Sequence, residues 1–240
     1  KIIGASLLVF LLGMLVGIVF LRLEFYFLFP ESSHKIYQWK HKWMDHLELY
    51  TDKWSFHPGE EIAVMVSNGK GAEVEVLLFD ILEKDTLHHS FQPATYQSVS
   101  DSSAIKGTYW KPSFSLTLPP QMPTGWYVLQ VKRGEFKRST SVMITPEEDA
   151  PKPIALLLST NTWNAYNHWG GFSIYSKNHT PTVSFLRPQL LADPYIENTY
   201  TNHQLYYQAA NKDKYLAILM DSLKIPFDVY PMEALHRGIS

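Results

Sequence analysis

Two phenols and one imidazole are the side chains of this sequence with the clearest chemical potential. Tyr166, His168 and Tyr175 stand within residues 159–175, a stretch dense in Trp, Tyr, Asn and His. A phenol oxygen can ligate a metal ion, and an imidazole can shuttle a proton near neutral pH. Each residue also has a plainer role, because a buried tyrosine can bond to a backbone carbonyl and a loop histidine can simply be solvated. Residue types alone leave both roles open.

The elements around this stretch should place it at the mouth of a parallel sheet. Ile154–Leu158 is a continuous apolar run, typical of a strand buried on both faces. A helix is predicted over residues 211–223 and a strand over residues 227–230. The expected buried stripe of that helix has three-four spacing: Tyr215, Ile218, Leu219 and Leu223. Strand, loop, helix and strand begin a doubly wound sheet, whose ligand sites lie beyond the carboxyl ends of strands.

Residues 162–175, here called the signature segment, closely resemble a motif of a known family. They include Trp-Asn-Ala-Tyr-Asn-His-Trp-Gly-Gly-Phe-Ser-Ile-Tyr. The N,N-dimethylformamidase large (beta) subunit-like family has Trp-x-Ala-Tyr-Asn-x-Trp-Gly-Gly-x-Ser-x-Tyr. Residues 183–188 look like the Ser-x-x-Arg-Pro that follows in the family, and residues 50–60 are similar to the opening of its sandwich domain. The resemblance covers about residues 47–240.

This resemblance implies an iron-dependent amidohydrolase with a small amide as substrate. The implied fold is related to class I glutamine amidotransferases (flavodoxin-like) but lacks their cysteine. Family members bind one iron through two tyrosines and a glutamate, which makes Tyr166, Tyr175 and Tyr215 the candidate ligands here, without a choice of two among the three. His168 is the candidate catalytic residue. The family glutamate lies in a downstream His-x-Glu-Tyr-type motif, so we expect this chain to be a fragment that is inactive alone.

Two other functions stay open beside the enzyme. The chain could be a non-catalytic binding or scaffold protein that retains the fold. It could also present a carbohydrate-binding surface lined by Trp163, Trp169 and Tyr175. Carbohydrate affinity without metal would distinguish the last of these functions from the enzyme.

Residues 47–146 are predicted to form an immunoglobulin-like β-sandwich. Apolar residues alternate with polar ones in several short runs, which is typical of half-buried strands: residues 61–67, 73–80, 114–118 and 127–132. Turn-forming dipeptides such as Asn68-Gly69 separate the runs. His88 and His89 are adjacent, so on a strand they point to opposite faces and cannot readily share one metal. We interpret them as solvated loop or edge residues.

The chain ahead of the sandwich is predicted to cross a membrane once. Residues 2–21 carry no charge and would form a helix about 30 Å long, enough to span a bilayer. A retained anchor is favoured over a cleaved signal peptide, because no small-residue cleavage pattern follows. The side on which the bulk of the chain lies stays open.

Together these predictions give a multidomain fold class: an N-terminal transmembrane helix, an immunoglobulin-like sandwich and an incomplete α/β domain. The expected boundaries run in chain order: anchor 1–29, juxtamembrane segment 30–46, sandwich 47–146, proline-rich linker 147–153 and α/β domain 154–240.

Composition excludes several functions. The 240 residues carry a formal net charge of −2, so no basic excess points to nucleic acid. The chain contains no cysteine, which excludes disulfides, thiolate metal sites and a cysteine nucleophile.

Overall fold

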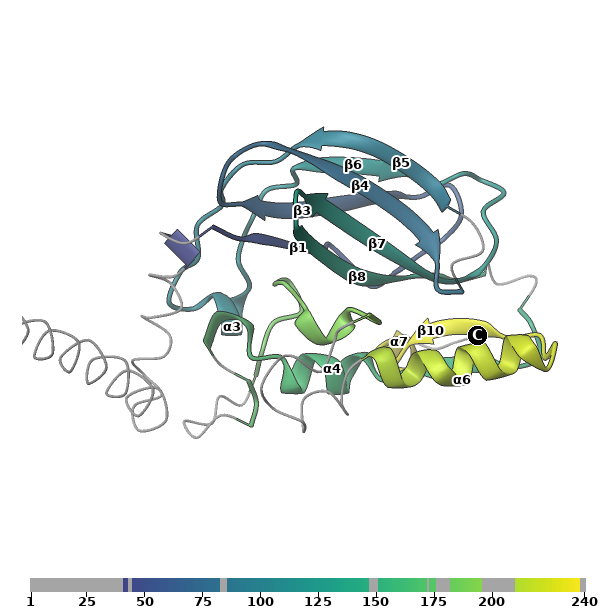
Figure 1. The fold of residues 1–240 in the computed structure, drawn as a ribbon. Coiled ribbons are helices and arrows are strands. Elements are labelled where there is room, and N and C mark those ends of the chain that lie inside the picture. The colour runs from purple at the N-terminus through teal and green to yellow at the C-terminus, as the bar shows by residue number, and fades with distance from the viewer. Residues whose placement is uncertain are drawn as a thin grey trace, which may run out of the picture.

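A computed structural model describes most of the chain downstream of residue 40 (Figure 1). The described residues are 41–42, 45–82, 86–146, 151–171, 173–175, 182–195 and 210–237. Strands dominate the described residues up to 146, and most of the helical elements follow residue 158. In Figure 1 the strands form an upper body, and the helices lie beneath it with one short strand pair.

The upper body is a sandwich of two sheets. The smaller sheet has the antiparallel order β1 (Leu47–Thr51), β3 (Glu61–Asn68) and β6 (Phe114–Thr117). The larger has the order β2 (Ser55–Phe56), β8 (Phe136–Ile144), β7 (Gly125–Arg133), β4 (Glu73–Asp80) and β5 (Thr86–Pro93). Its pairs are antiparallel except that β2 runs parallel to β8.

The centre of the larger sheet is buried on both faces, as strand β7 shows. Tyr127, Leu129 and Val131 point into the core between the two sheets, which confirms the predicted alternation. Trp126 and Val128 point the other way, into a second apolar core shared with the helices below. This second core joins the sandwich to the rest of the chain.

The lower body begins with a parallel strand pair. Strand β9 (Ala155–Leu158) lies beside β10 (Asp228–Pro231), with Leu156 opposite Val229. The helical elements are α3 (Ser103–Lys106), α4 (Thr160–Tyr166), η1 (Trp169–Gly171), η2 (Leu190–Ala192), α6 (Ala210–Ser222) and α7 (Ala234–Arg237). Strands predicted at 154–158 and 227–230 and the helix predicted at 211–223 are therefore confirmed within a residue or two.

Asp228 ties the start of β10 to the sandwich. Its carboxylate accepts hydrogen bonds from Thr124 Oγ1 and from the backbone N–H of Lys152, both at 2.6 Å. Burial acts to raise the pKa of Asp228, but these bonds and the Lys152 ammonium at 3.1 Å outweigh it, so the pKa is lowered. The carboxylate stays ionised and holds three segments together.

The predicted stripe of the helix at 211–223 is wrong. Four of its members are at least 40% exposed: Tyr215, Ile218, Leu219 and Leu223. Helix α6 instead buries Ala210, Asn211, Ala217 and Met220. The small alanine side chains allow close approach to the second core, and spacing alone does not reveal which face packs.

The predicted fold class and the predicted single-pass membrane location are both corrected. The described part of the chain is a sheet-rich fold with few helices, none of them long and apolar enough to cross a membrane. The longest of them, α6, has 13 residues and rises about 20 Å, against the ~30 Å of a bilayer's hydrocarbon core. The predicted span at residues 2–21, with its bilayer contact, lies outside the described residues. The predicted domain boundaries stay predictions.

Strand β5 is an edge strand that carries the adjacent histidines. His88 Nε2 lies 2.8 Å from Ser90 Oγ, and His89 Nε2 lies 3.0 Å from Glu75 Oε1. The two rings therefore contact different neighbours. This confirms the interpretation of His88 and His89 as edge residues.

Candidate functional site

A cluster of polar side chains lies at the carboxyl edge of the β9–β10 pair. Thr160 follows β9 and Glu233 follows β10, and the Thr160 hydroxyl donates to Glu233 Oε2 at 2.8 Å. The same hydroxyl oxygen accepts the Met232 N–H at 2.9 Å. Ligands bind beyond this edge in open α/β sheets, so the cluster occupies the expected location of a site.

Asp213 of α6 reaches the same edge. Its carboxylate accepts the Ser159 N–H at 2.8 Å and lies 3.3 Å from Ser159 Oγ. Burial raises the pKa of Asp213, and the bonds from Ser159 and Trp163 offset this only in part. The edge therefore holds a carboxyl group that takes up a proton more readily than an exposed aspartate.

The two tyrosines of the signature segment stack on each other. Tyr166 ends α4, and its ring centroid lies 4.3 Å from that of Tyr175 at an interplanar angle of 29°. Tyr175 is 59% exposed, so the pair opens to solvent. Desolvation raises the pKa of the Tyr166 phenol, with a further contribution from the neighbouring Tyr175. The Tyr166 phenol is thus neutral at pH 7 in the absence of a ligand.

The third predicted tyrosine, Tyr215, is not part of this stack. Tyr215 is 58% exposed on α6, with Lys212 Nζ 5.8 Å from its ring centroid. Among the described residues, no ring contact joins Tyr215 to Tyr166 or Tyr175. The structure brings together two of the three predicted tyrosines, and their role as ligands stays a prediction.

His168 lies on the loop between the stacked tyrosines. Its Nε2 is 3.4 Å from Ser173 Oγ. The ring reaches solvent, yet the protein atoms around it and then the Arg187 guanidinium lower the pKa of His168. The imidazole is therefore neutral at pH 7 and able to accept a proton.

The tryptophans of the signature segment are structural. Trp163 and Trp169 are each 1% exposed. Trp163 packs between Trp54 and Trp126, with centroid separations of 5.8 and 6.0 Å. Trp169 meets Trp110 edge to face at 5.8 Å. Neither indole can line a surface, so the carbohydrate-binding surface predicted from them is not formed.

Arg187 is fully buried and stabilises the signature segment through hydrogen bonds from its guanidinium group. Its Nη1 donates to the Trp169 carbonyl at 2.6 Å, its Nη2 to the Asn164 carbonyl at 3.2 Å and its Nε to the Ser184 carbonyl at 3.0 Å. These acceptors explain why an arginine follows the signature segment. Its five fixed donors match several carbonyls at once.

Asn167 and Gln189 extend this buried network. Asn167 Nδ2 donates to Gln189 Oε1 at 2.9 Å, and Gln189 Nε2 donates to Asn164 Oδ1 at 3.0 Å. Asn167 Oδ1 accepts the Trp169 N–H at 3.1 Å. The asparagines of the signature segment therefore fix its backbone. The sequence analysis did not identify Gln189, because no local pattern distinguishes this buried glutamine from an exposed one.

Gly170 shows why a glycine is needed at the turn. Its φ is +81°, in the left-handed region, and a Cβ there would lie 3.3 Å from the Ala104 Cβ of α3. The turn thus packs directly against the sandwich domain's short helix.

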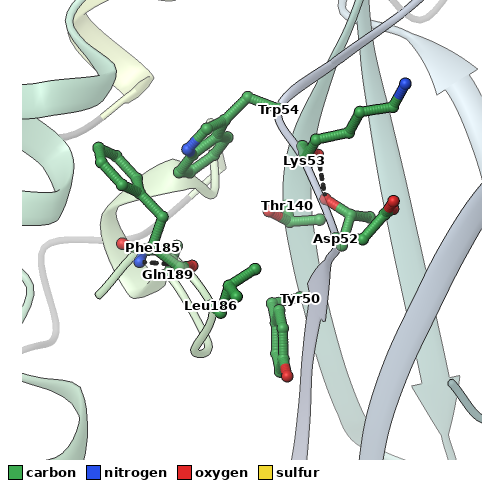
Figure 2. A pocket seen from close by; sticks show the side chains of 9 residues that line it. Tyr50, Asp52, Lys53, Trp54, Thr140, Phe185, Leu186 and Gln189 are labelled. Carbon is green, nitrogen blue, oxygen red and sulfur yellow. Dashed lines mark hydrogen bonds between the residues drawn. The ribbon is translucent and has the colours of Figure 1, made fainter. Parts of the chain in front are cut away.

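The pocket between this network and the sandwich is too small for a substrate. Figure 2 shows Phe185, Leu186 and Gln189 facing Tyr50 and Trp54 across it. Its volume of about 20 Å³ accommodates one water molecule. The signature segment is therefore closely packed where it contacts Arg187 and Gln189. Its solvent-exposed side carries the Tyr166–Tyr175 stack.

Next to the signature segment, the segment that carries η2 docks on β8. The Ala192 carbonyl accepts the Ser141 hydroxyl at 2.6 Å, and Asp193 Oδ1 accepts the Tyr195 N–H at 2.9 Å. Burial raises the pKa of Asp193 to about 6, although Tyr195 and the charges of three basic residues act to lower it: Lys137, Arg138 and Lys214. Folding therefore favours the protonated carboxyl.

This shift predicts a pH dependence of stability. The folded pKa of Asp193 lies above its ordinary 3.8, so its favourable contribution is complete below about pH 4 and is lost as pH rises through 6. We expect the free energy of unfolding to fall by roughly 1–2 kcal/mol more in the wild type than in Asp193→Asn between pH 4 and pH 7. Urea unfolding at several pH values measures this, and parallel curves would contradict it.

One further group of side chains has metal-ligating potential. Among the described residues, His41, His46 and Glu48 form a group whose ligand atoms all lie within 4.8 Å of one another. Sequence analysis missed this group. The signal was present, because His46 and Glu48 are two residues apart at the start of a strand and share a face.

Of the comparisons with known proteins, the family model is the one that identifies a family. A search of curated proteins found no match. One matching solved structure is Spo0M, a sporulation control protein from Bacillus subtilis, at 18% identity and a TM-score of 0.24, over 42% of this chain and 48% of that one. So weak a likeness carries no argument. The family model for "N,N-dimethylformamidase beta subunit-like, C-terminal" matches residues 68–240, well over half of the chain. The chain belongs to the N,N-dimethylformamidase beta subunit-like, C-terminal family.

Proposed function

We propose that this chain supplies the iron-binding tyrosines of an amidohydrolase that cleaves the C–N bond of small amides. The observation that carries the proposal is the stacking of Tyr166 on Tyr175 at 4.3 Å. The pair lies within the signature segment, downstream of the strand whose carboxyl edge forms the expected site. Tyr175 is 59% exposed, so the stack can be reached from solvent.

The phenols fit a ferric ion as ligands, under one condition. The pKa of Tyr166 is raised, so its proton must leave when the phenol binds. A bound ferric ion supplies the charge that stabilises phenolates, polarises an amide carbonyl and lowers the pKa of a water. Asp213 and Glu233 are the carboxylates at the carboxyl edge of the β9–β10 pair. They already accept hydrogen bonds from Ser159 and Thr160.

We assign proton transfer during hydrolysis to His168. Its lowered pKa keeps the imidazole neutral, and Ser173 Oγ at 3.4 Å helps to orient Nε2. A neutral imidazole can take a proton from an attacking water and return it to the leaving amine. Arg187 beneath the loop opposes the imidazolium and so favours the return of that proton.

Amide hydrolysis by the full-length protein tests the proposal. With iron and a panel of small amides, we expect amine release to fall at least about 100-fold in Tyr166→Phe and in Tyr175→Phe. Tyr215→Phe is the matched control, because that ring is exposed on α6 and lies outside the stack. Full activity in both signature variants would contradict the proposal, and loss only in Tyr215→Phe would move the site to α6.

A further inference from the structure

We infer that His41, His46 and Glu48 form a second metal site, which takes one divalent transition-metal ion of the zinc class. The site lies where the chain enters β1, ahead of the residues matched by the family model. It shares no residue with the tyrosine stack and does not depend on the proposed function. Its role is to clamp the segment before β1 onto the sandwich.

The three side chains already converge to nearly the spacing that a metal requires. His41 Nε2 lies 2.9 Å from Glu48 Oε2, and the rings of His41 and His46 have centroids 4.0 Å apart. All three ligand atoms lie within 4.8 Å of one another. Zinc bonds of about 2.0–2.1 Å in a tetrahedron place ligand atoms roughly 3.3 Å apart. Rotamer adjustments of about an ångström would therefore complete the site.

Two of the ligands are held by the sandwich itself. The His46 carbonyl accepts the Gly69 N–H at 3.0 Å, and His46 Nε2 lies 2.9 Å from Ser67 Oγ. Glu48 sits on β1 directly opposite Ser67 on β3. A Cβ at position 69 would come within 3.0 Å of His46 Nδ1, so the glycine leaves the ring its space. The strands therefore hold His46 and Glu48 in position before a metal binds.

The surroundings favour a buried charge at this position. The side chains of His41 and Glu48 are 2% and 13% exposed. Aromatic rings enclose His41, with Tyr96 at 5.6 Å, Trp110 at 5.9 Å and Trp169 at 6.4 Å between centroids. Apolar walls lower the local dielectric and strengthen the attraction between a cation and a carboxylate. Trp169 belongs to the signature segment, so an ion here would also fix that segment from the sandwich side.

Donor chemistry identifies the class of ion. Two imidazoles and one carboxylate suit zinc, cobalt, nickel or ferrous iron, whereas calcium and magnesium prefer oxygen ligands alone. Tyr96 and Trp110 also line an open groove of about 610 Å³, which offers a path from solvent. Three protein ligands leave a fourth position for water or for an anion.

The competing explanation is an ion pair between a protonated His41 and Glu48 without any metal. Titration of the tag-free full chain with Zn²⁺ and Co²⁺ separates the two. We expect one equivalent to bind and to raise Tm, and Glu48→Gln to weaken binding at least about 100-fold. The matched control is Glu75→Gln, which removes the partner of His89 in a histidine–glutamate contact of 3.0 Å on the exposed edge. This variant should bind Zn²⁺ as the wild type does.

A wild-type measurement covers the case in which Glu48→Gln fails to fold. Zinc-edge X-ray absorption of the loaded chain should show two imidazoles in the coordination sphere, and cobalt should give the intense visible bands of a low-coordinate site. Tyr166→Phe and Tyr175→Phe should retain zinc, which separates this site from the proposed iron site. No zinc bound at one equivalent, or equal binding by the Glu48 and Glu75 variants, overturns the inference.

Discussion

Trp163→Ala is expected to lower the free energy of unfolding by about 3–5 kcal/mol. The Trp163 indole is 1% exposed and packs against Trp54 and Trp126, which come from the sandwich. Its removal would leave a cavity in the second apolar core, the layer that joins the sandwich to the helices. Urea unfolding followed by far-UV circular dichroism measures the loss. With about 2–4 °C per kcal/mol for a chain of this size, Tm should fall by roughly 6–20 °C.

Phe91→Ala provides the aromatic control for this effect. Phe91 is 58% exposed on the edge strand β5, so its removal opens no cavity. We expect a change of less than about 0.5 kcal/mol. Equal losses in the Trp163 and Phe91 variants would show that the second core does not hold the two bodies together.

Arg187→Met should be destabilising by roughly 3–5 kcal/mol. The substitution keeps the apolar stem but removes the donors that reach the carbonyls of Asn164, Trp169 and Ser184. Each acceptor left buried without a donor costs about 1–3 kcal/mol. Because two of these carbonyls belong to the signature segment, we also expect the Tyr166–Tyr175 stack to loosen. Thermal unfolding measures the first effect, and tyrosine ring NMR signals report the second.

Arg138→Met separates this network from a general effect of removing an arginine. Arg138 is half-buried, and its Nη1 makes one exposed hydrogen bond to the adjacent Lys137 carbonyl, so its loss should cost about 1 kcal/mol, well below the loss for Arg187. Wild-type stability in Arg187→Met would contradict the structural role given to the buried guanidinium.

Local sequence patterns predicted the secondary structure well, because each depends on near neighbours. Period-two alternation identified β3, β4, β6 and β7, and the apolar run at 154–158 identified β9. The packing face of α6 was not predictable in this way. Its apolar stripe at Tyr215 and Leu219 is exposed, and only the contacts of Ala217 and Met220 with the second core decide which face is inside.

The candidate site was predictable in location but not in detail. The signature segment pointed to Tyr166 and Tyr175, and the structure stacks their rings. Arg187 and Gln189 donate to backbone carbonyls such as those of Ser184 and Phe185, which carry no sequence signal. The cluster of His41 with Glu48 depends on how the chain enters β1. The sequence separation between these two residues does not determine that path.

The most direct test of the central claim is the optical spectrum of the chain titrated with Fe³⁺, with resonance Raman excitation in the new band. Two phenols sharing one ion should give a tyrosinate-to-iron charge-transfer band with tyrosine ring modes. The band should vanish or weaken strongly in Tyr166→Phe and in Tyr175→Phe, and it should persist in Tyr215→Phe. A band of full intensity in both signature variants, or no band in the wild type, would contradict the account.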